Sequence, residues 1–204
     1  MPWCASRRRT PPPLATCARV AGSSDQTCPM GTLLVVTGPP GAGKSSVARV
    51  LVDRAPPSVL VEGDAFFAFL AAGAVPPWLP ESDAQNRIVG RAAAAATAVF
   101  AADYDTVYDG VLGPWQLDDF MRAGAFRLLD YAVILPPVGV CIERVATRVG
   151  HGFDDEAAAR HMHAEFSDAA IDPRHVFAEV VNAPEAMAGL IAERRATGAL
   201  HRSV

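Results

Sequence analysis

Apolar and polar positions along the chain follow two alternating periods, which predict strands and helices in turn. Short apolar runs of strand length occur at residues 32–37, 58–62, 106–108, 131–135 and 176–181. Residues with helical spacing lie between and after them, at 45–52, 65–70, 82–102, 115–121, 138–148, 155–166 and 184–197. This order predicts an α/β fold in which a five-stranded, mainly parallel sheet is covered by helices on both faces.

One edge of such a sheet is expected to bind the ligand. In parallel α/β sheets, ligands lie beyond the carboxyl ends of the strands. Polar and glycine-rich segments follow the predicted strands at residues 38–45, at Asp64 and at residues 109–115. We therefore expect these segments to meet at one edge, together with the region after the fourth strand.

The segment after the first predicted strand carries the most specific motif. Its residues fit the spacing G-x-x-x-x-G-K-[ST] of a phosphate-binding P-loop, and they are Gly38, Pro39, Pro40, Gly41, Ala42, Gly43, Lys44 and Ser45, followed by Ser46. In a P-loop the backbone N–H groups cradle phosphates, the lysine contacts the β- and γ-phosphates, and the hydroxyl ligates Mg²⁺. A chance Gly/Pro-rich turn is the alternative, but the flanking strand and helix favour the functional interpretation.

Composition strengthens this interpretation. Lys44 is the only lysine among 18 basic residues. A lysine is a compact point charge on a thin stem, whereas arginine is a planar fork. The Asn-Lys-x-Asp motif of regulatory GTPases cannot occur in this chain. Motor ATPases typically carry Asp-Glu at the end of the corresponding strand, and here Asp109 is followed by Gly110.

Length and charge predict one P-loop domain over residues 31–204, preceded by an extension. Residues 1–30 are rich in Pro, Ser and Arg, which is typical of disorder. The remaining chain has 14 basic and 21 acidic residues, a net charge of −7, which disfavours nucleic-acid or membrane partners and favours a small ligand. The four cysteines show no metal-ligand spacing. We expect a cytoplasmic protein, either monomeric or homodimeric.

Two aspartates that follow strands are candidates for chemistry. Asp64 follows the second predicted strand and is the candidate general base and substrate-orienting residue, because transfer to an alcohol needs a carboxylate to accept its proton. The alternative is a helix N-cap. Asp109 ends the third strand, where a magnesium-binding aspartate is expected beside Ser45. Its alternative is a turn residue in Asp-Gly.

Three larger side chains complete the candidate site. Trp115 is a candidate substrate wall, with a core tryptophan as the alternative. Arg144 and Arg148 share one helix face, from which they could close over the nucleotide phosphates as part of a lid. Arg148 is the preferred catalytic arginine and Arg144 a nucleotide-binding one. Their alternative is a pair of solvated surface arginines.

These motifs together resemble those of small P-loop kinases. The resemblance is to the group that contains chloramphenicol phosphotransferase, gluconate and shikimate kinases and zeta-toxin-like proteins. It covers about residues 31–182 and is carried by Gly38–Ser45, Gly63-Asp64, Asp109-Gly110 and Arg144-x-x-x-Arg148. It implies a P-loop NTPase fold with a small helical lid, and it supports Asp64 as the base.

The sequence therefore predicts an ATP- and Mg²⁺-dependent phosphotransferase. Its acceptor would be a hydroxyl group of a small molecule such as a metabolite, nucleoside or antibiotic. The alternative is a P-loop ATP-binding protein or ATPase with a regulatory or switch role.

Overall fold

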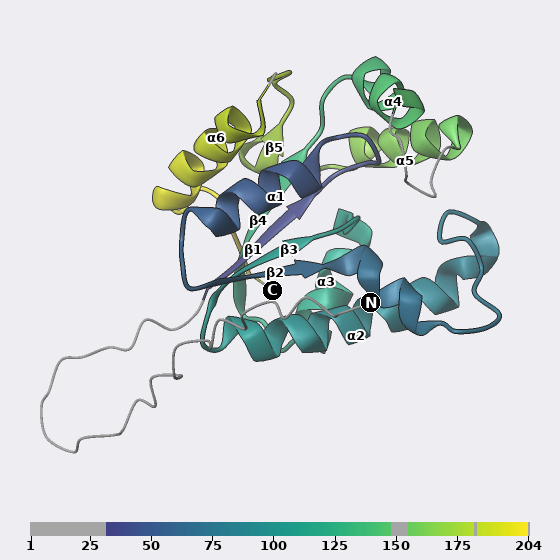
Figure 1. The fold of residues 1–204 in the computed structure, drawn as a ribbon, viewed down its shortest axis with the longest axis horizontal. Helices are drawn as coiled ribbons and strands as arrows, with labels where there is room; N and C mark the ends of the chain where they lie inside the picture. Colours follow the sequence, from purple (N-terminus) through teal and green to yellow (C-terminus); the bar gives the residue numbers. More distant parts are fainter. Residues whose placement is uncertain (1–31, 148–154, 182, 204) are drawn as a thin grey trace, which may run out of the picture.

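The structure is a computed structural model that describes residues 32–147, 155–181 and 183–203 (Figure 1). The predicted N-terminal extension and Arg148 lie outside the described residues. None of the described helices has the length and apolar character that a membrane crossing requires.

The described residues alternate between strands and helices, as predicted. The strands are β1 (Leu33–Thr37), β2 (Ser58–Glu62), β3 (Asp105–Asp109), β4 (Leu128–Ile134), β5 (Val176–Phe177) and β6 (His201–Ser203). The α-helices are α1 (Lys44–Asp53), α2 (Asp83–Ala101), α3 (Pro114–Ala123), α4 (Val138–Thr147), α5 (Glu156–Asp168) and α6 (Pro184–Ala196). Short 3₁₀ helices are η1 (Gly63–Phe69), η2 (Pro80–Ser82) and η3 (Pro173–His175).

The strands form one sheet in the order β2-β3-β1-β4-β5, and all of these neighbours are parallel. This arrangement confirms the predicted fold class. The sheet also contains β6, an antiparallel strand on β4 that the sequence pattern did not predict. All three residues of β6 are exposed, so the strand has no apolar pattern. The fifth strand is shorter than predicted, because only Val176 and Phe177 pair with β4.

Two cores cover the two faces of the sheet. Successive side chains of a strand point to opposite faces, and in β1 Leu34 and Val36 pack with α1 and α6, whereas Leu33 and Val35 pack with α2 and α3. Figure 1 shows these helix pairs on opposite sides of the sheet. Burial on both faces explains why β1 is a continuous apolar run rather than an alternating one. Helices α4 and α5 lie side by side beyond the sheet, where the lid was predicted.

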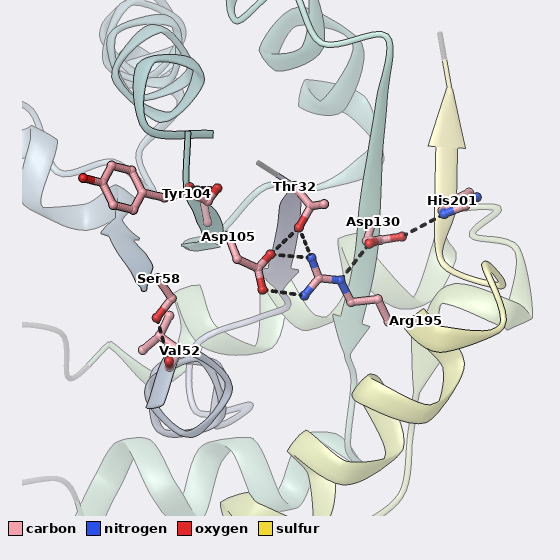
Figure 2. A network of polar contacts seen from close by, with 9 residues as sticks. Thr32, Val52, Ser58, Tyr104, Asp105, Asp130, Arg195 and His201 are labelled. Atoms are coloured by element: carbon pink, nitrogen blue, oxygen red, sulfur yellow. Dashed lines mark hydrogen bonds and ion pairs between the residues drawn. The ribbon is translucent and has the colours of Figure 1, made fainter. Parts of the chain in front are cut away.

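A polar network closes the edge of the sheet where the strands begin (Figure 2). Arg195 of α6 donates from Nη2 to Asp105 Oδ1 at 2.8 Å and from Nε to Asp130 Oδ2 at 2.9 Å. It thereby ties α6 to the first residue of β3 and to β4. Burial alone would raise the pKa of Asp105, but the hydrogen bonds from Arg195 and Thr32 outweigh burial and lower it. The network therefore favours the charged carboxylate.

We predict that Arg195→Met lowers the free energy of unfolding by about 3 kcal/mol, because it leaves two shielded carboxylates without their cation. Methionine keeps an apolar stem of similar length, so the loss reports mainly on charge. Chemical denaturation at pH 7 measures it. The matched control is Arg122→Met in the exposed pair with Asp119, which should cost about 0.5 kcal/mol or less. Equal effects of the two substitutions would contradict the structural role of Arg195.

Candidate functional site

The loop between β1 and α1 is pressed against neighbouring backbone. Gly38, Gly41 and Gly43 have φ angles of +146°, +77° and +97°, a region that side chains disfavour. A Cβ atom on Gly38 would lie 2.1 Å from the carbonyl oxygen of Ile134, and one on Gly41 would lie 2.2 Å from that of Cys141. Only glycine fits at these two positions, between the end of β4 and the first turn of α4.

The loop leads directly into α1, whose N-terminus is open to an anion. The helix begins at Lys44, and its N-cap residue, Gly43, has no side chain to accept from the first backbone N–H groups. Such unpaired N–H groups and the helix dipole together attract phosphate. The start of α1 therefore has the local geometry that phosphate binding requires.

Lys44, Ser45 and Asp109 come together at the end of β3. The parallel register sets Val36 beside Asp109, which brings the end of β3 next to the start of the loop. Burial raises the pKa of Asp109, while the charge of Lys44 and a hydrogen bond with Ser45 lower it, and the net shift is upward. The charges of Asp64 and Glu62 add to the upward shift. The two predicted metal ligands, Ser45 and Asp109, therefore lie close to each other, and Asp64 lies near enough for its charge to act on Asp109.

Asp109 has an unsatisfied oxygen that fits a cation. Its Oδ1 atom is buried and has no hydrogen-bond partner among the described residues, and the residue is 6% exposed. Carboxylate and hydroxyl oxygens suit Mg²⁺, which keeps several water or phosphate ligands. No group of three or more His, Cys, Asp or Glu side chains in the described part of the chain could hold a metal ion. A cation held by Asp109 and Ser45 would thus need further oxygens from a ligand or from water.

Asp64 lies within η1, directly after β2, and its side chain is exposed. The sequence predicts a helix over residues 65–70, with its N-cap as the alternative role of Asp64. Instead the helix is a 3₁₀ helix that begins at Gly63, and its N-cap position is Glu62. The carboxylate of Asp64 is therefore available for other partners at the edge where the strands end.

Tyr108 and Glu62 also belong to this edge, and the sequence analysis missed both. A Cβ atom on Gly63 would lie 2.3 Å from the hydroxyl oxygen of Tyr108, so the end of β2 runs directly over the ring. Burial, and then the charges of Asp64 and Asp109, raise the pKa of this tyrosine. Glu62 pairs with Arg49 of α1 at 2.5 Å. In the sequence, only the glycines at positions 63 and 110, which lie against Tyr108 in the structure, could have pointed to a side chain packed at this edge.

Arg144 contacts the loop from α4. Its Nη1 atom lies 3.2 Å from the carbonyl oxygen of Ala42 and 3.4 Å from that of Gly41. The alternative of a solvated surface residue is therefore wrong for Arg144. Arg148, the preferred catalytic arginine, lies outside the described residues and stays a prediction.

A cavity of about 370 Å³ lies beside the loop between β1 and α1, and Arg144 is one of the residues that line it. The residues of the loop and of the start of α1, from Gly41 to Val47, form its floor. Its other lining residues come from the end of β4, from α4 and from the segment around the start of α6, and they are Ile134, Pro136, Arg144, Thr147, Glu179, Val181, Pro184 and Met187. The sequence singles out only Arg144 among them, because the nearness of the others to the loop depends on how distant segments pack around it.

Trp115 stands at the start of α3 and is 48% exposed. Its ring meets Phe166 of α5 edge-on, with 5.2 Å between ring centroids. The preceding segment is fixed, because the Leu112 N–H donates to Thr37 Oγ1 at 2.8 Å and Tyr131 donates to the Leu112 carbonyl at 2.8 Å. Trp115 is therefore a held but half-exposed aromatic surface rather than a core residue.

A family model described as an AAA domain matches residues 33–170. The chain belongs to this AAA domain family. The match begins with β1 and ends just after α5, so it contains the P-loop, Asp64, Asp109 and Arg144. A search of curated proteins gave no match.

Solved structures share the fold of this AAA domain protein. A tunicamycin resistance protein of Deinococcus radiodurans has 15% identity and a TM-score of 0.62, with 81% of this chain and 95% of that chain covered. Shikimate kinase of Acinetobacter baumannii has 16% identity and a TM-score of 0.59, with 84% and 96% covered. A gluconokinase of Sinorhizobium meliloti has 22% identity and a TM-score of 0.56, with 83% and 94% covered. The resemblance to the fold of P-loop small-molecule kinases is confirmed.

We predict that Gly41→Ala lowers the free energy of unfolding by about 2 kcal/mol, because alanine is strained at this φ and its Cβ meets backbone. Affinity for nucleotide should fall about tenfold or more, since the loop must move away. The matched control is Gly90→Ala, in the interior of α2 with no atom within 4 Å of the added Cβ. That change should raise stability by about 0.5–1 kcal/mol. Similar stability changes in both variants, measured by denaturation, would contradict the predicted clash.

A second prediction concerns the stability cost of Asp109. Because its pKa is raised in the folded protein, the charged carboxylate opposes folding at neutral pH, and the penalty disappears as pH falls below the unfolded-state value. Asp109→Asn should therefore increase the free energy of unfolding at pH 7, without nucleotide or divalent cation. The difference from the wild type should shrink towards pH 4. Chemical denaturation across this range tests it, and a variant less stable than the wild type at pH 7 would refute it.

Proposed function

We propose that this protein is an ATP- and Mg²⁺-dependent phosphotransferase that moves the γ-phosphate to a hydroxyl group of a small molecule. The observation that carries the proposal is the meeting of a P-loop with two carboxylates at the ends of β2 and β3. Lys44 and the start of α1 suit the phosphates, while Asp109 and Asp64 suit a cation and a hydroxyl group.

The cavity beside the P-loop supports a place for the nucleoside. Arg144 and Pro184 line it, and its floor is the first turn of α1. A base in this cavity would leave the phosphates to run along the loop towards Lys44. The guanidinium of Arg144 can stack on a planar ring while it keeps its contacts with the loop carbonyls.

Ser45 and Asp109 would hold Mg²⁺, which neutralises charge on the β- and γ-phosphates when it is bound. The unsatisfied Oδ1 atom of Asp109 and the neighbouring Ser45 hydroxyl support this role. Lys44, which is 9% exposed, would supply a second positive charge beside the transferred phosphoryl group.

Asp64 would accept the proton of the acceptor hydroxyl. The hydroxyl oxygen then forms a bond to the γ-phosphorus, the bond from that phosphorus to the β,γ-bridging oxygen breaks, and ADP leaves. Exposure of Asp64 at the ligand edge supports access to an incoming molecule. The backbone N–H groups at the start of α1 would hold the phosphates in line for this displacement.

We predict that Asp64→Asn lowers kcat about 100-fold or more, because the amide cannot accept the proton. The affinity for Mg·ATP should stay within about twofold, since Asp64 does not contact the P-loop phosphates in this scheme. ADP release with a panel of hydroxylated compounds gives kcat, and calorimetry gives the nucleotide affinity. Lys44→Ala should instead abolish both phosphoryl transfer and the binding of Mg·ATP.

The matched control is Asp83→Asn, an exposed acidic residue in the first turn of α2. It should leave kcat and nucleotide affinity unchanged. Near-normal turnover in Asp64→Asn would remove Asp64 from the reaction. ATP hydrolysis stimulated only by a protein or nucleic acid would favour the alternative of a switch or motor ATPase.

A further inference from the structure

The two segments expected to receive the acceptor contain no cation. These segments are residues 55–86, which include β2, η1 and η2, and residues 105–121, which include β3 and the start of α3. Neither contains lysine, arginine or histidine. Sites that recognise carboxylate, sulfate or phosphate groups commonly use arginine in a bidentate pair. These two segments therefore supply no such partner.

The same edge is negatively charged. The parallel register sets Glu62 beside Asp109, and Asp64 follows at the start of η1. Two cations in the described part of the chain lie near these carboxylates: Arg49 pairs with Glu62, and in the proposed function the charge of Lys44 is directed at the nucleotide phosphates. An anionic acceptor would therefore approach Asp64 with both cations already engaged, and juxtaposed like charges disfavour binding.

Aromatic and aliphatic side chains stand exposed on these segments. Phe69, at the end of η1, is 80% exposed, and its ring lies 5.8 Å from that of Phe66. Trp115 is 48% exposed and Leu79 is 40% exposed. Large apolar side chains left exposed on segments that lead away from a polar site are candidates for a ligand-binding surface.

The segment that carries Leu79 is fixed rather than loose. Gln85 of α2 accepts from the Val75 N–H at 2.9 Å and donates to the Val75 carbonyl at 2.7 Å. Ser82 and Asn86 donate to the Pro77 carbonyl at 2.9 and 2.7 Å. This surface is therefore preformed, which lowers the entropy cost of binding against it.

Resting on the proposed function, we infer that the phosphoryl acceptor is a hydroxyl compound that lacks an anionic group and carries an apolar or aromatic portion. Its hydroxyl would reach Asp64, and its apolar portion would cover Phe69 and Trp115. The nearest cation after the first segment is Arg87, an exposed residue of α2, and in this inference it does not contact the acceptor.

Matched pairs of compounds test this inference. Each pair differs by one charged group and keeps its hydroxyl groups: methyl shikimate and shikimate, and the methyl ester and free acid of N-benzoylserine. Phosphoryl transfer from ATP is measured for each. Binding is measured separately by calorimetry in the presence of Mg²⁺ and a non-hydrolysable ATP analogue. The neutral member should bind more tightly and react with a kcat/KM about tenfold higher or more.

Variants test the surface. Trp115→Ala should weaken binding of the neutral aromatic member about tenfold, with the KM for ATP unchanged. The matched control is Phe100→Ala, an aromatic residue of similar exposure, 43%, in the last turn of α2, where it should have no effect. Arg87→Ala should also have no effect.

Tighter binding or faster turnover of the anionic members would overturn the inference, as would loss of their binding in Arg87→Ala. Absence of binding by every member would overturn it too. Binding of the neutral members without any transfer would leave the acceptor class supported and refute the phosphotransferase proposal, so the two failures are distinguishable.

Discussion

The close approach of the β1–α1 loop to two other backbone segments is the constraint on which the site depends. At Gly38 and Gly41 the space for a side chain is already taken by the carbonyl oxygens of Ile134 and Cys141. The loop is thus held between β4 and α4, and it can enter α1 only with its backbone N–H groups exposed to a ligand. The direction of Lys44 towards the end of β3 follows from this constraint, and so does the contact of Arg144 with the loop carbonyls.

The parallel register then gathers the acidic groups. Val36 and Glu62 both lie beside Asp109, so three neighbouring strands end at one place. The two edges of the sheet treat their carboxylates differently. Where the strands begin, Arg195 pairs with Asp105 and Asp130 and closes the fold. Where they end, Asp109 instead lies beside Lys44 and Ser45 of the loop, and burial raises its pKa. One buried oxygen of Asp109 and one of Asp130 lack a hydrogen-bond partner among the described residues, but only Asp109 lies beside the loop. A carboxylate whose pKa is raised lowers stability at neutral pH, and such a local cost is typical of a site that a ligand completes.

Local signals in the sequence predicted the parallel strands, the glycine loop and the polar residues that follow the strands. Strand β6 could not be predicted because its three residues are exposed and its pairing with β4 depends on where α6 ends. The position of Tyr108 beneath Gly63 and the walls of the cavity near Pro184 come from packing between distant segments. The sequence placed Trp115 and Arg144 near the site, but only the structure shows that one is half-exposed and that the other contacts the loop.

In the proposed function, the loop at Lys44 presents the γ-phosphate of ATP to a hydroxyl group beside Asp64. Following a label on that phosphate tests the claim most directly. The protein is incubated with γ-labelled ATP, Mg²⁺ and a mixture of neutral hydroxylated compounds, and the labelled products are separated. We expect label in an acid-stable organic phosphate ester, formed in equal amount with ADP. Label recovered only as inorganic phosphate, or retained only in ATP, would contradict it.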